Sequence, residues 1–160
     1  MANTTFSGPV TSTAGFISGS DSLVSATAAT LTVTSALHSG RTVLLDRAAG
    51  QAVTLPAATG SGNTYKFFVV TTITSNSTTI KVVGDDVMAG AAIVANDSDA
   101  SASIFETAAT SDTITFNGST TGGIKGATVE LQDVAADLWS VRIVGAATGS
   151  EVTPFSATVP

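Results

Sequence analysis

Residues 128–144 read TVELQDVAADLWSVRIV, and apolar and polar side chains alternate on both sides of the middle of this stretch. The apolar side chains that share one face are Val129, Leu131, Trp139, Val141 and Ile143. Successive side chains of a β-strand point to opposite faces of the sheet. The stretch therefore predicts two strands, 128–134 and 138–144, joined by a tight turn, each with one buried face.

Short runs with the same period of two recur along the chain on both sides of this pair. They predict further strands at 31–34, 42–46, 51–55, 65–72, 79–83, 103–107 and 113–117. Gly, Asn and Ser separate the runs, as in the segments 60–63 and 118–126, which we expect to be flexible connections. No segment has a convincing helical period. Many short strands without helices predict an all-β fold, a single antiparallel β-sandwich or a small β-barrel.

The inward positions of these runs define the expected core. Its members are Val43, Leu45, Val53, Leu55, Phe67, Val69, Ile80, Val82, Ile114, Phe116, Val129, Leu131, Trp139, Val141 and Ile143. Burial of each larger side chain contributes about 1.5–3 kcal/mol, which is enough to stabilise one domain. Trp139 lies on an inward face, so we interpret it as a core residue rather than a sugar-stacking platform.

The segment 85–103 does not follow the pattern. Its sequence is compatible with a loose hairpin or a short helix, and we expect it to be an excursion from the β body.

The two ends differ in composition from the middle. We divide the chain into an extended N-terminal arm, 1–30, a β body, 31–146, and an extended C-terminal tail, 147–160. Ordering a Ser/Thr/Gly-rich arm costs about 1–2 kcal/mol per residue, so such an arm is useful only if it binds something. The residues that we expect to anchor the ends on a partner are Phe6, Pro9, Val10, Phe16, Ile17 and Phe155.

Charge and composition exclude several classes of partner. Charged residues make up 11% of the 160 residues, and the net charge is −6. The six cations are scattered, whereas a nucleic-acid or anionic-membrane binder needs clustered Lys and Arg. There is no Cys for a disulfide or a thiolate ligand. The first residues lack the basic and continuous apolar regions of a secretory signal, and no run is long enough to span a bilayer, so we expect a soluble, cytosolically made protein.

The sequence offers only weak candidates for catalysis or metal binding. They are the single histidine, His38, the carboxylate pairs Asp85/Asp86, Asp97/Asp99 and Glu130/Asp133, and the Gly-rich segment 118–126. His38 has no nucleophile motif beside it, and we interpret it as a turn residue. Residues 96–99 match only half of a calcium loop, and 118–126 lacks the order of a phosphate-binding loop. We therefore expect no enzymatic activity, no metal and no cofactor.

Several short stretches resemble a family of structural proteins of tailed bacteriophages, the head decoration or cement proteins. These stretches are TFSGPV at 5–10, GFI at 15–17, VTLPAATGSG at 53–62 with YKF at 65–67, SDTITF at 111–116 with Gly122 and Gly123, LWSV at 138–141 with Gly145 and Gly149, and PFSA at 154–157. They span most of the chain, but each is short. Fibre and spike proteins of phages carry a hairpin similar to the one at 55–62.

The resemblance implies an all-β body, usually a homotrimer, on the outer surface of the virion's capsid. Its partner would be the major capsid protein, and a terminal arm would lie across the shell or a neighbouring subunit. The alternatives are a tail-fibre or spike domain that binds host glycans, and a bacterial surface adhesin, which the missing secretory signal disfavours.

Overall fold

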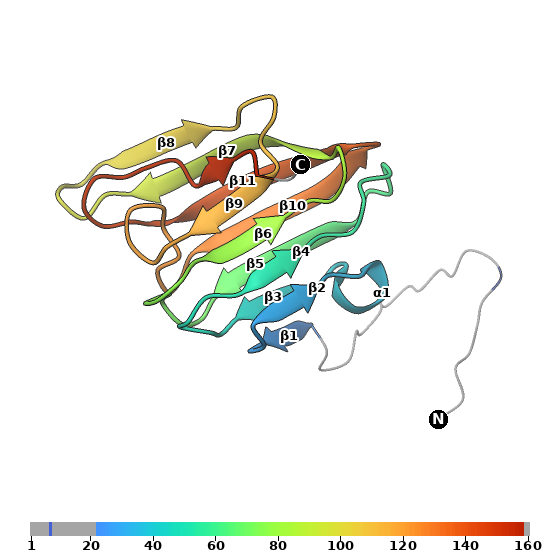
Figure 1. Cartoon of the computed structure of the whole chain (residues 1–160), viewed down its shortest axis with the longest axis horizontal. Helices are drawn as coiled ribbons and strands as arrows, with labels where there is room; N and C mark the ends of the chain where they lie inside the picture. Colours follow the sequence, from blue (N-terminus) through green and yellow to red (C-terminus); the bar gives the residue numbers. More distant parts are fainter. Residues whose placement is uncertain (1–6, 8–21, 159–160) are drawn as a thin grey trace, which may run out of the picture.

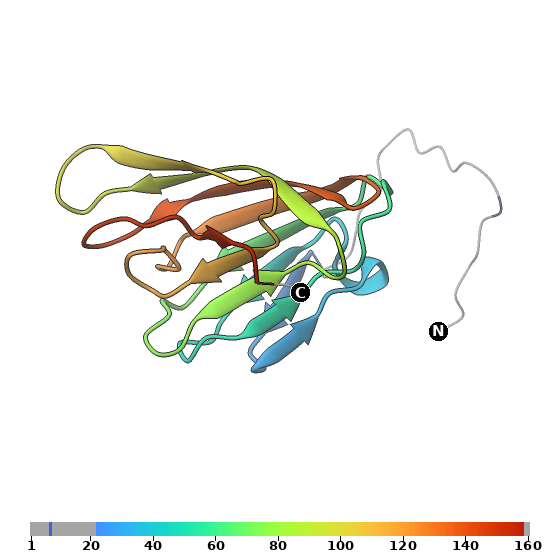
Figure 2. The ribbon, with the colours of Figure 1, turned by 45° about the horizontal axis from the view of Figure 1, so that its top comes forward.

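The computed structural model describes Ser7 and residues 22–158, and places most of them in two β-sheets packed face to face. Figure 1 looks through the two layers, and Figure 2 tilts them so that they separate. The fold is an all-β sandwich, as the alternating runs predict. The described residues contain no helix with the length and apolarity needed to cross a bilayer.

The strands and the one short helix have the following bounds: β1 Leu23–Ala26, β2 Thr30–Thr32, α1 Ser35–His38, β3 Thr42–Leu45, β4 Ala52–Thr54, β5 Thr64–Val69, β6 Thr78–Lys81, β7 Val87–Ala95, β8 Ala102–Glu106, β9 Thr113–Phe116, β10 Thr128–Ala135, β11 Leu138–Ala146 and β12 Phe155–Ser156. All nine strands expected from the alternation are present, with ends that shift by up to three residues.

The expectation of an antiparallel sandwich is wrong for half of the strand pairs. The seven-stranded sheet has the order β1-β3-β5-β10-β11-β7-β8, and the five-stranded sheet has the order β12-β9-β6-β4-β2. Five neighbouring pairs are parallel: β1/β3, β3/β5, β2/β4, β4/β6 and β7/β11. Both sheets are therefore mixed.

Four of the five parallel pairs, all except β7/β11, arise because the first six strands alternate between the sheets. The chain passes from β1 to β2 in the other sheet and returns to β3 beside β1, and it repeats this crossing through β6. Strands two apart in sequence therefore become neighbours that run in the same direction. The connection from β3 to β4 crosses between layers and is not a hairpin, although Gly and Asn at such connections are also typical of hairpins.

The core lies between the two layers. All fifteen residues expected there are buried. The sequence did not identify several others that are equally inaccessible: Val33, Tyr65, Ile73, Met88, Ala92 and Val94. Both sheets contribute side chains to this single cluster, so each sheet covers the inner face of the other.

The segment expected to be an excursion belongs to the sandwich. β7 has nine residues, pairs in parallel with β11 and forms an antiparallel hairpin with β8. Met88, Ala92 and Val94 point inward and are buried. The many Ala residues hide the alternation, because Ala occupies both inward and outward positions of this strand.

The boundaries of the expected arm and tail also differ from the structure. β1 lies within the segment 1–30 and pairs with β3, so the sandwich begins at Leu23. β12 lies within the segment 147–160 and pairs with β9. Each strand is short, and its backbone hydrogen bonds are made with residues distant in sequence. Local composition therefore does not reveal them.

Candidate interaction face

The outward side chains of the seven-stranded sheet form two rows that cross the strands. We call this side of the molecule the outer face. One row contains Thr42, Lys66, Glu130, Arg142, Ala91 and Glu106, each opposite the next on a neighbouring strand. This row places cations and acids alternately over β5, β10 and β11. No segment of the sequence contains this arrangement, because its charges come from four separate strands, with Glu106 on β8.

The adjacent row on the outer face is mostly apolar. Strand pairing aligns Leu44, Phe68, Thr128, Val144, Ile93 and Ile104 from β3 to β8. We call the five apolar members the apolar row. Leu44 and Phe68 are partly exposed, and Val144, Ile93 and Ile104 are 40%, 41% and 67% exposed. With strands about 4.8 Å apart, the row is about 24 Å long. Thr128 is the one polar member of the aligned residues, between Phe68 and Val144. An exposed patch of several apolar side chains is typical of a protein-binding site.

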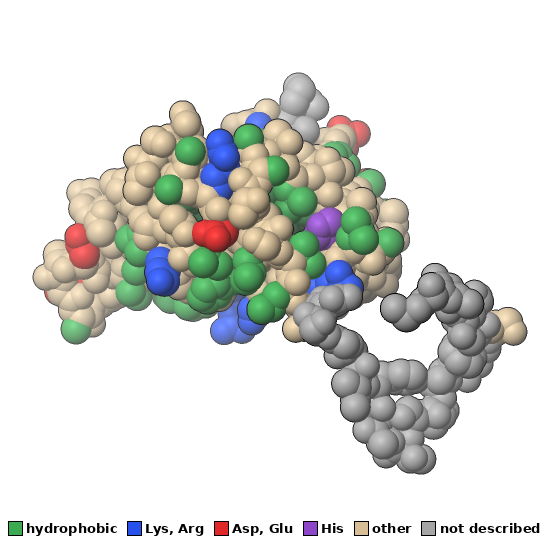
Figure 3. Space-filling model, turned by 90° about the horizontal axis from the view of Figure 1, so that it is seen from below, with side chains coloured by type: hydrophobic (Ala, Val, Ile, Leu, Met, Phe, Trp, Pro, Cys, Tyr) green, Lys and Arg blue, Asp and Glu red, His purple; other side chains and the backbone are tan. Residues whose placement is uncertain are grey.

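Figure 3 shows hydrophobic side chains beside Lys and Arg side chains along the lower edge of the molecule, on the side of the seven-stranded sheet. An open hollow of about 400 Å³ lies on the same face, over β3, β5, β10 and β11. Its charged lining consists of Arg41, Lys66, Glu130 and Arg142, and Thr42, Thr64, Gln132 and Ser140 add polar groups. The lining therefore carries three of the chain's six cations but only one of its twelve acids.

Two of these charges face each other across a strand pair. The ammonium Nζ of Lys66 lies 3.3 Å from Oε1 of Glu130. Both side chains are about half exposed, so water weakens this ion pair. Arg142 is opposite Glu130 in the register, but within the described part of the chain its exposed guanidinium makes no ion pair or hydrogen bond. Arg41 lies at the rim, where its Nη1 donates to the carbonyl of Leu37 at 3.1 Å.

The end of β10 holds the loop 58–62, part of the stretch that resembles phage structural proteins. The carboxylate of Asp133 accepts hydrogen bonds from the backbone N–H groups of Thr59, Gly60 and Ser61 at 3.0, 2.6 and 3.0 Å, and from the hydroxyl groups of Thr59 and Ser61. The loop is therefore fixed rather than flexible as we expected. It positions the start of β5, and with it Thr64 and Lys66 in the hollow.

These donors also set the ionisation of Asp133. Burial alone would raise the pKa of its carboxyl, because the charged form loses its hydration. The hydrogen bonds from the Ser61 hydroxyl and from the N–H groups of Ser61, Thr59 and Gly60 outweigh burial and lower the pKa from 3.8 to about 2. Asp133 is therefore a charged anchor for the loop at neutral pH. Burial and the charge of Asp133 raise the pKa of the neighbouring Tyr65 phenol.

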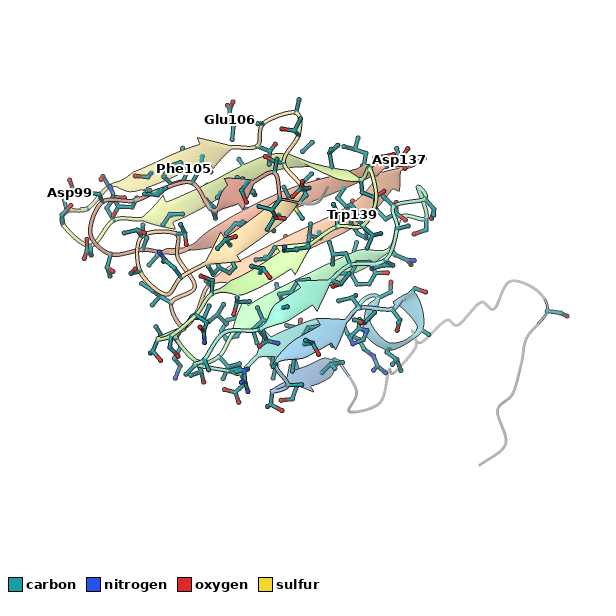
Figure 4. All side chains as sticks on the ribbon, viewed as in Figure 1. Asp99, Phe105, Glu106, Asp137 and Trp139 are labelled. Carbon is teal, nitrogen blue, oxygen red and sulfur yellow. The ribbon has the colours of Figure 1, made fainter. Side chains whose placement is uncertain are left out.

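A second buried carboxylate supports the other side of the same loop. Oδ2 of Asp86 accepts from the backbone N–H of Ala58 at 2.7 Å and from the indole N–H of Trp139 at 3.3 Å. Trp139 is fully buried and packs at a tilt on Tyr65, with ring centroids 5.6 Å apart. The prediction that Trp139 belongs to the core is confirmed, and Figure 4 shows its position among the strands.

The remaining candidate residues of the sequence have local structural contacts. His38 is buried at the end of α1, and its Nδ1 accepts from the backbone N–H of Thr34 at 3.0 Å. Asp97 caps Gly149 N–H, and Asp99 bonds to the Ser101 hydroxyl at the tip of the β7–β8 hairpin. Glu130 and Asp133 lie on opposite faces of β10 and do not form a carboxylate pair. Among the described residues, no three His, Asp or Glu side chains gather closely enough to hold a metal ion.

The Gly-rich segment 118–126 is not the flexible connection that we expected. Its first part closes on itself, since Gly118 N–H donates to the carbonyl of Gly122 at 2.8 Å. The side-chain oxygen of Asn117 accepts from the N–H groups of Ser119 and Thr121 at 2.8 and 3.1 Å.

The residues expected to anchor the chain on a partner fall into two groups. Phe6, Pro9, Val10, Phe16 and Ile17 lie outside the described residues. Phe155 is described, and the expectation that it contacts a partner is wrong, because its side chain is 7% exposed and belongs to the core of its own chain. The pairing of β12 with β9 places it there, opposite Ile114.

Comparison of the chain with protein-family models, curated proteins and solved structures finds no match to any of them.

The outer face is a candidate interaction surface that the sequence did not predict. Its apolar row draws on five strands, and its hollow on side chains from β3, β5, β10 and β11 and the residues beside them. One signal was available: Val144, Ile93 and Ile104 are large apolar residues at the outward positions of their strands.

Proposed function

We propose that this chain is a capsid decoration protein, which binds the outer surface of a phage head and stabilises the junctions between capsomers. The observation that best supports this function is the apolar row beside the charged hollow on the outer face. Exposing an apolar row drawn from five strands to water is unfavourable, whereas a protein seated on a shell can bury it. The all-β sandwich and the resemblance to cement proteins agree with this proposal.

The mechanism is mechanical and needs no catalytic group. Packaged DNA exerts pressure on the shell, and the junctions between capsomers are its weak points. A protein that binds only the expanded shell adds its binding free energy to the stability of that state. Buried apolar area contributes about 25 cal/mol per Å² to each contact, and many contacts on one particle act together.

Two further features belong to the proposal. Self-association as a homotrimer would multiply the contacts of each sandwich with the shell. The segment that contains Phe6, Pro9, Val10, Phe16 and Ile17 would provide a second contact, either with the major capsid protein or with a neighbouring subunit. Because β1 begins at Leu23, a test of this segment should remove residues 1–21 and leave the sandwich complete.

The glycan-binding alternative has less support. Binding of sugars usually uses exposed aromatic side chains, and the chain has one Trp and one Tyr. Both are buried, and their rings pack on each other inside the sandwich.

The test uses heads stripped of accessory proteins. Purified protein is added back to expanded shells, and the temperature at which they release DNA is measured. We expect binding in hundreds of copies per particle and a higher release temperature. A few copies at one vertex would instead indicate a fibre or spike component, and an unchanged release temperature with full binding would contradict the stabilising role.

A further inference from the structure

The net charge of the hollow is opposite in sign to the net charge of the whole chain. The hollow contains Arg41, Lys66 and Arg142 against Glu130, a local net charge of +2, while the chain has a net charge of −6. Half of all cations are gathered on one part of the surface by pairing of β3, β5, β10 and β11. An acidic protein with one basic hollow attracts a partner through that hollow rather than through its remaining surface.

The side chains that line the hollow favour a carboxylate as the anionic group that binds there. Lys66 is already paired with Glu130, whereas the guanidinium of Arg142 has no partner within the described residues. A guanidinium donates two parallel hydrogen bonds to one carboxylate. Thr42, Thr64, Gln132 and Ser140 line the same hollow and carry hydroxyl or amide groups that can donate further hydrogen bonds.

The apolar row determines which kind of anionic partner fits. Glu130 and Arg142, in the hollow, are each two residues along their strands from Thr128 and Val144, in the row. A partner that occupies both must present apolar side chains next to its acids. A nucleic-acid backbone has phosphates at every step and no apolar side chains, so it does not fit the row. A protein segment in which acidic and apolar residues are neighbours fits both.

We propose that the hollow binds an acidic segment of the shell protein, with a carboxylate on Arg142 and apolar side chains along the apolar row. This proposal rests on the proposed function and adds to it the docking face and the chemistry of the partner. Binding is then sensitive to salt, because part of the attraction acts between exposed charges.

The test compares variants of the full chain for binding to expanded shells. Arg142→Glu reverses a charge in the hollow, and Lys125→Glu makes the same change at an exposed position outside it. Loss of a charge-assisted hydrogen bond predicts at least about tenfold weaker binding for Arg142→Glu, and less than about twofold for Lys125→Glu. Ile104→Asn should also weaken binding, whereas Val152→Asn, at an exposed position off the outer face, should not.

Each outcome has one meaning, provided that the unfolding midpoints of all four variants match that of the natural chain. Equal binding of the Arg142 and Lys125 variants overturns this inference and leaves the decoration function intact. If the unaltered protein does not bind shells, the decoration function fails.

In that case, a short peptide with alternating Glu and Leu tests the hollow directly, with a Lys/Leu peptide as control. Amide NMR shifts in β5, β10 and β11 caused only by the Glu peptide, and abolished by Arg142→Glu, support the inference. Absence of these shifts overturns it.

Discussion

The hydroxyl of Ser61 donates a hydrogen bond of 2.6 Å to the carboxylate of Asp133, although the two residues are 72 positions apart in the chain. The backbone N–H of Ser61 donates to the same oxygen at 3.0 Å. This contact joins the loop before β5 to the end of β10, next to the hollow on the outer face. The loop at 59–61 is therefore held in place by a carboxylate from a distant strand.

Replacement of Asp133 should destabilise the protein far more than replacement of an exposed aspartate. Asp133→Asn puts an amide group among N–H donors and removes charge-assisted hydrogen bonds, so we expect the free energy of unfolding at pH 7 to fall by about 2–4 kcal/mol. Ser61→Ala removes one side-chain bond and should cost about 1 kcal/mol. Denaturant unfolding measures both. Asp137→Asn is the control, because Asp137 is exposed and Asn accepts its positive φ of 59°. Equal effects at 133 and 137 would contradict the anchoring role.

The same carboxylate should make stability depend on acid pH. Its pKa is about 2 in the folded protein and 3.8 ordinarily, so the unfolded state binds the proton more tightly. The stabilisation is complete above about pH 4 and is lost as the pH falls towards 2, an effect of about 2 kcal/mol. The difference in unfolding free energy between the natural chain and Asp133→Asn should therefore narrow by about this amount from pH 7 to pH 2. A difference that stays constant over this range would refute the lowered pKa.

Gly118 should tolerate a side chain less well than another glycine of the same backbone conformation. Gly118 and Gly62 have φ of 79° and 74°. A Cβ at 118 would lie 1.7 Å from the carbonyl oxygen of Ile73, while a Cβ at 62 would have open space around it. Gly62→Ala should cost about 1–2 kcal/mol for the left-handed conformation alone. Gly118→Ala should cost about 1–3 kcal/mol more, because the backbone of the neighbouring loop must move. Thermal and denaturant unfolding of the two variants decide this, and equal losses would disprove the close approach.

We expect the polar side chain of Gln51 to weaken the fold. It is 3% exposed, and within the described residues neither atom of its amide group has a hydrogen-bond partner. Burial of an unpartnered amide costs free energy, so Gln51→Met should raise the free energy of unfolding by about 1–2 kcal/mol. Gln132→Met, the same change at an exposed position, should have little effect. A loss of stability in Gln51→Met would show that an internal water or another group bonds to this amide.

Phe155 should matter for stability and not directly for binding. Phe155→Ala leaves a cavity between β12 and the core, and we expect it to cost about 3–4 kcal/mol. Val152→Ala, at an exposed position in the same tail, should change the free energy of unfolding by less than about 0.5 kcal/mol. Shell binding should be unchanged at temperatures where the Phe155→Ala variant is still folded. Weaker binding by a fully folded variant would restore Phe155 as a partner contact.

The sequence by itself determined nine of the twelve strands in the described part of the chain, and more than half of the core. The alternation in 128–144 and in seven other runs predicted nine strands and fifteen buried residues, and all of them are present. This succeeded because the side chain's direction along a strand is a local property. It depends on the period of two and not on which strand lies alongside. The same reasoning missed β7, where Ala on both faces removes the contrast. It also missed β1, in which only Ala26 is buried, and β12, which has only two residues.

Only the tertiary structure decided which strands are neighbours. It therefore also decided which residues distant in sequence are in contact. Parallel pairing of β1, β3 and β5 follows from crossings between the sheets, which the Gly- and Asn-containing connections do not specify. The anchoring of residues 59–61 by Asp133 and the burial of Phe155 also depend on residues far apart in the chain. The apolar row and the basic hollow exist only because register aligns outward side chains from separate strands. Register depends mainly on long-range packing of the buried faces, because a cross-strand pair of outward side chains contributes only about 0.2–1 kcal/mol.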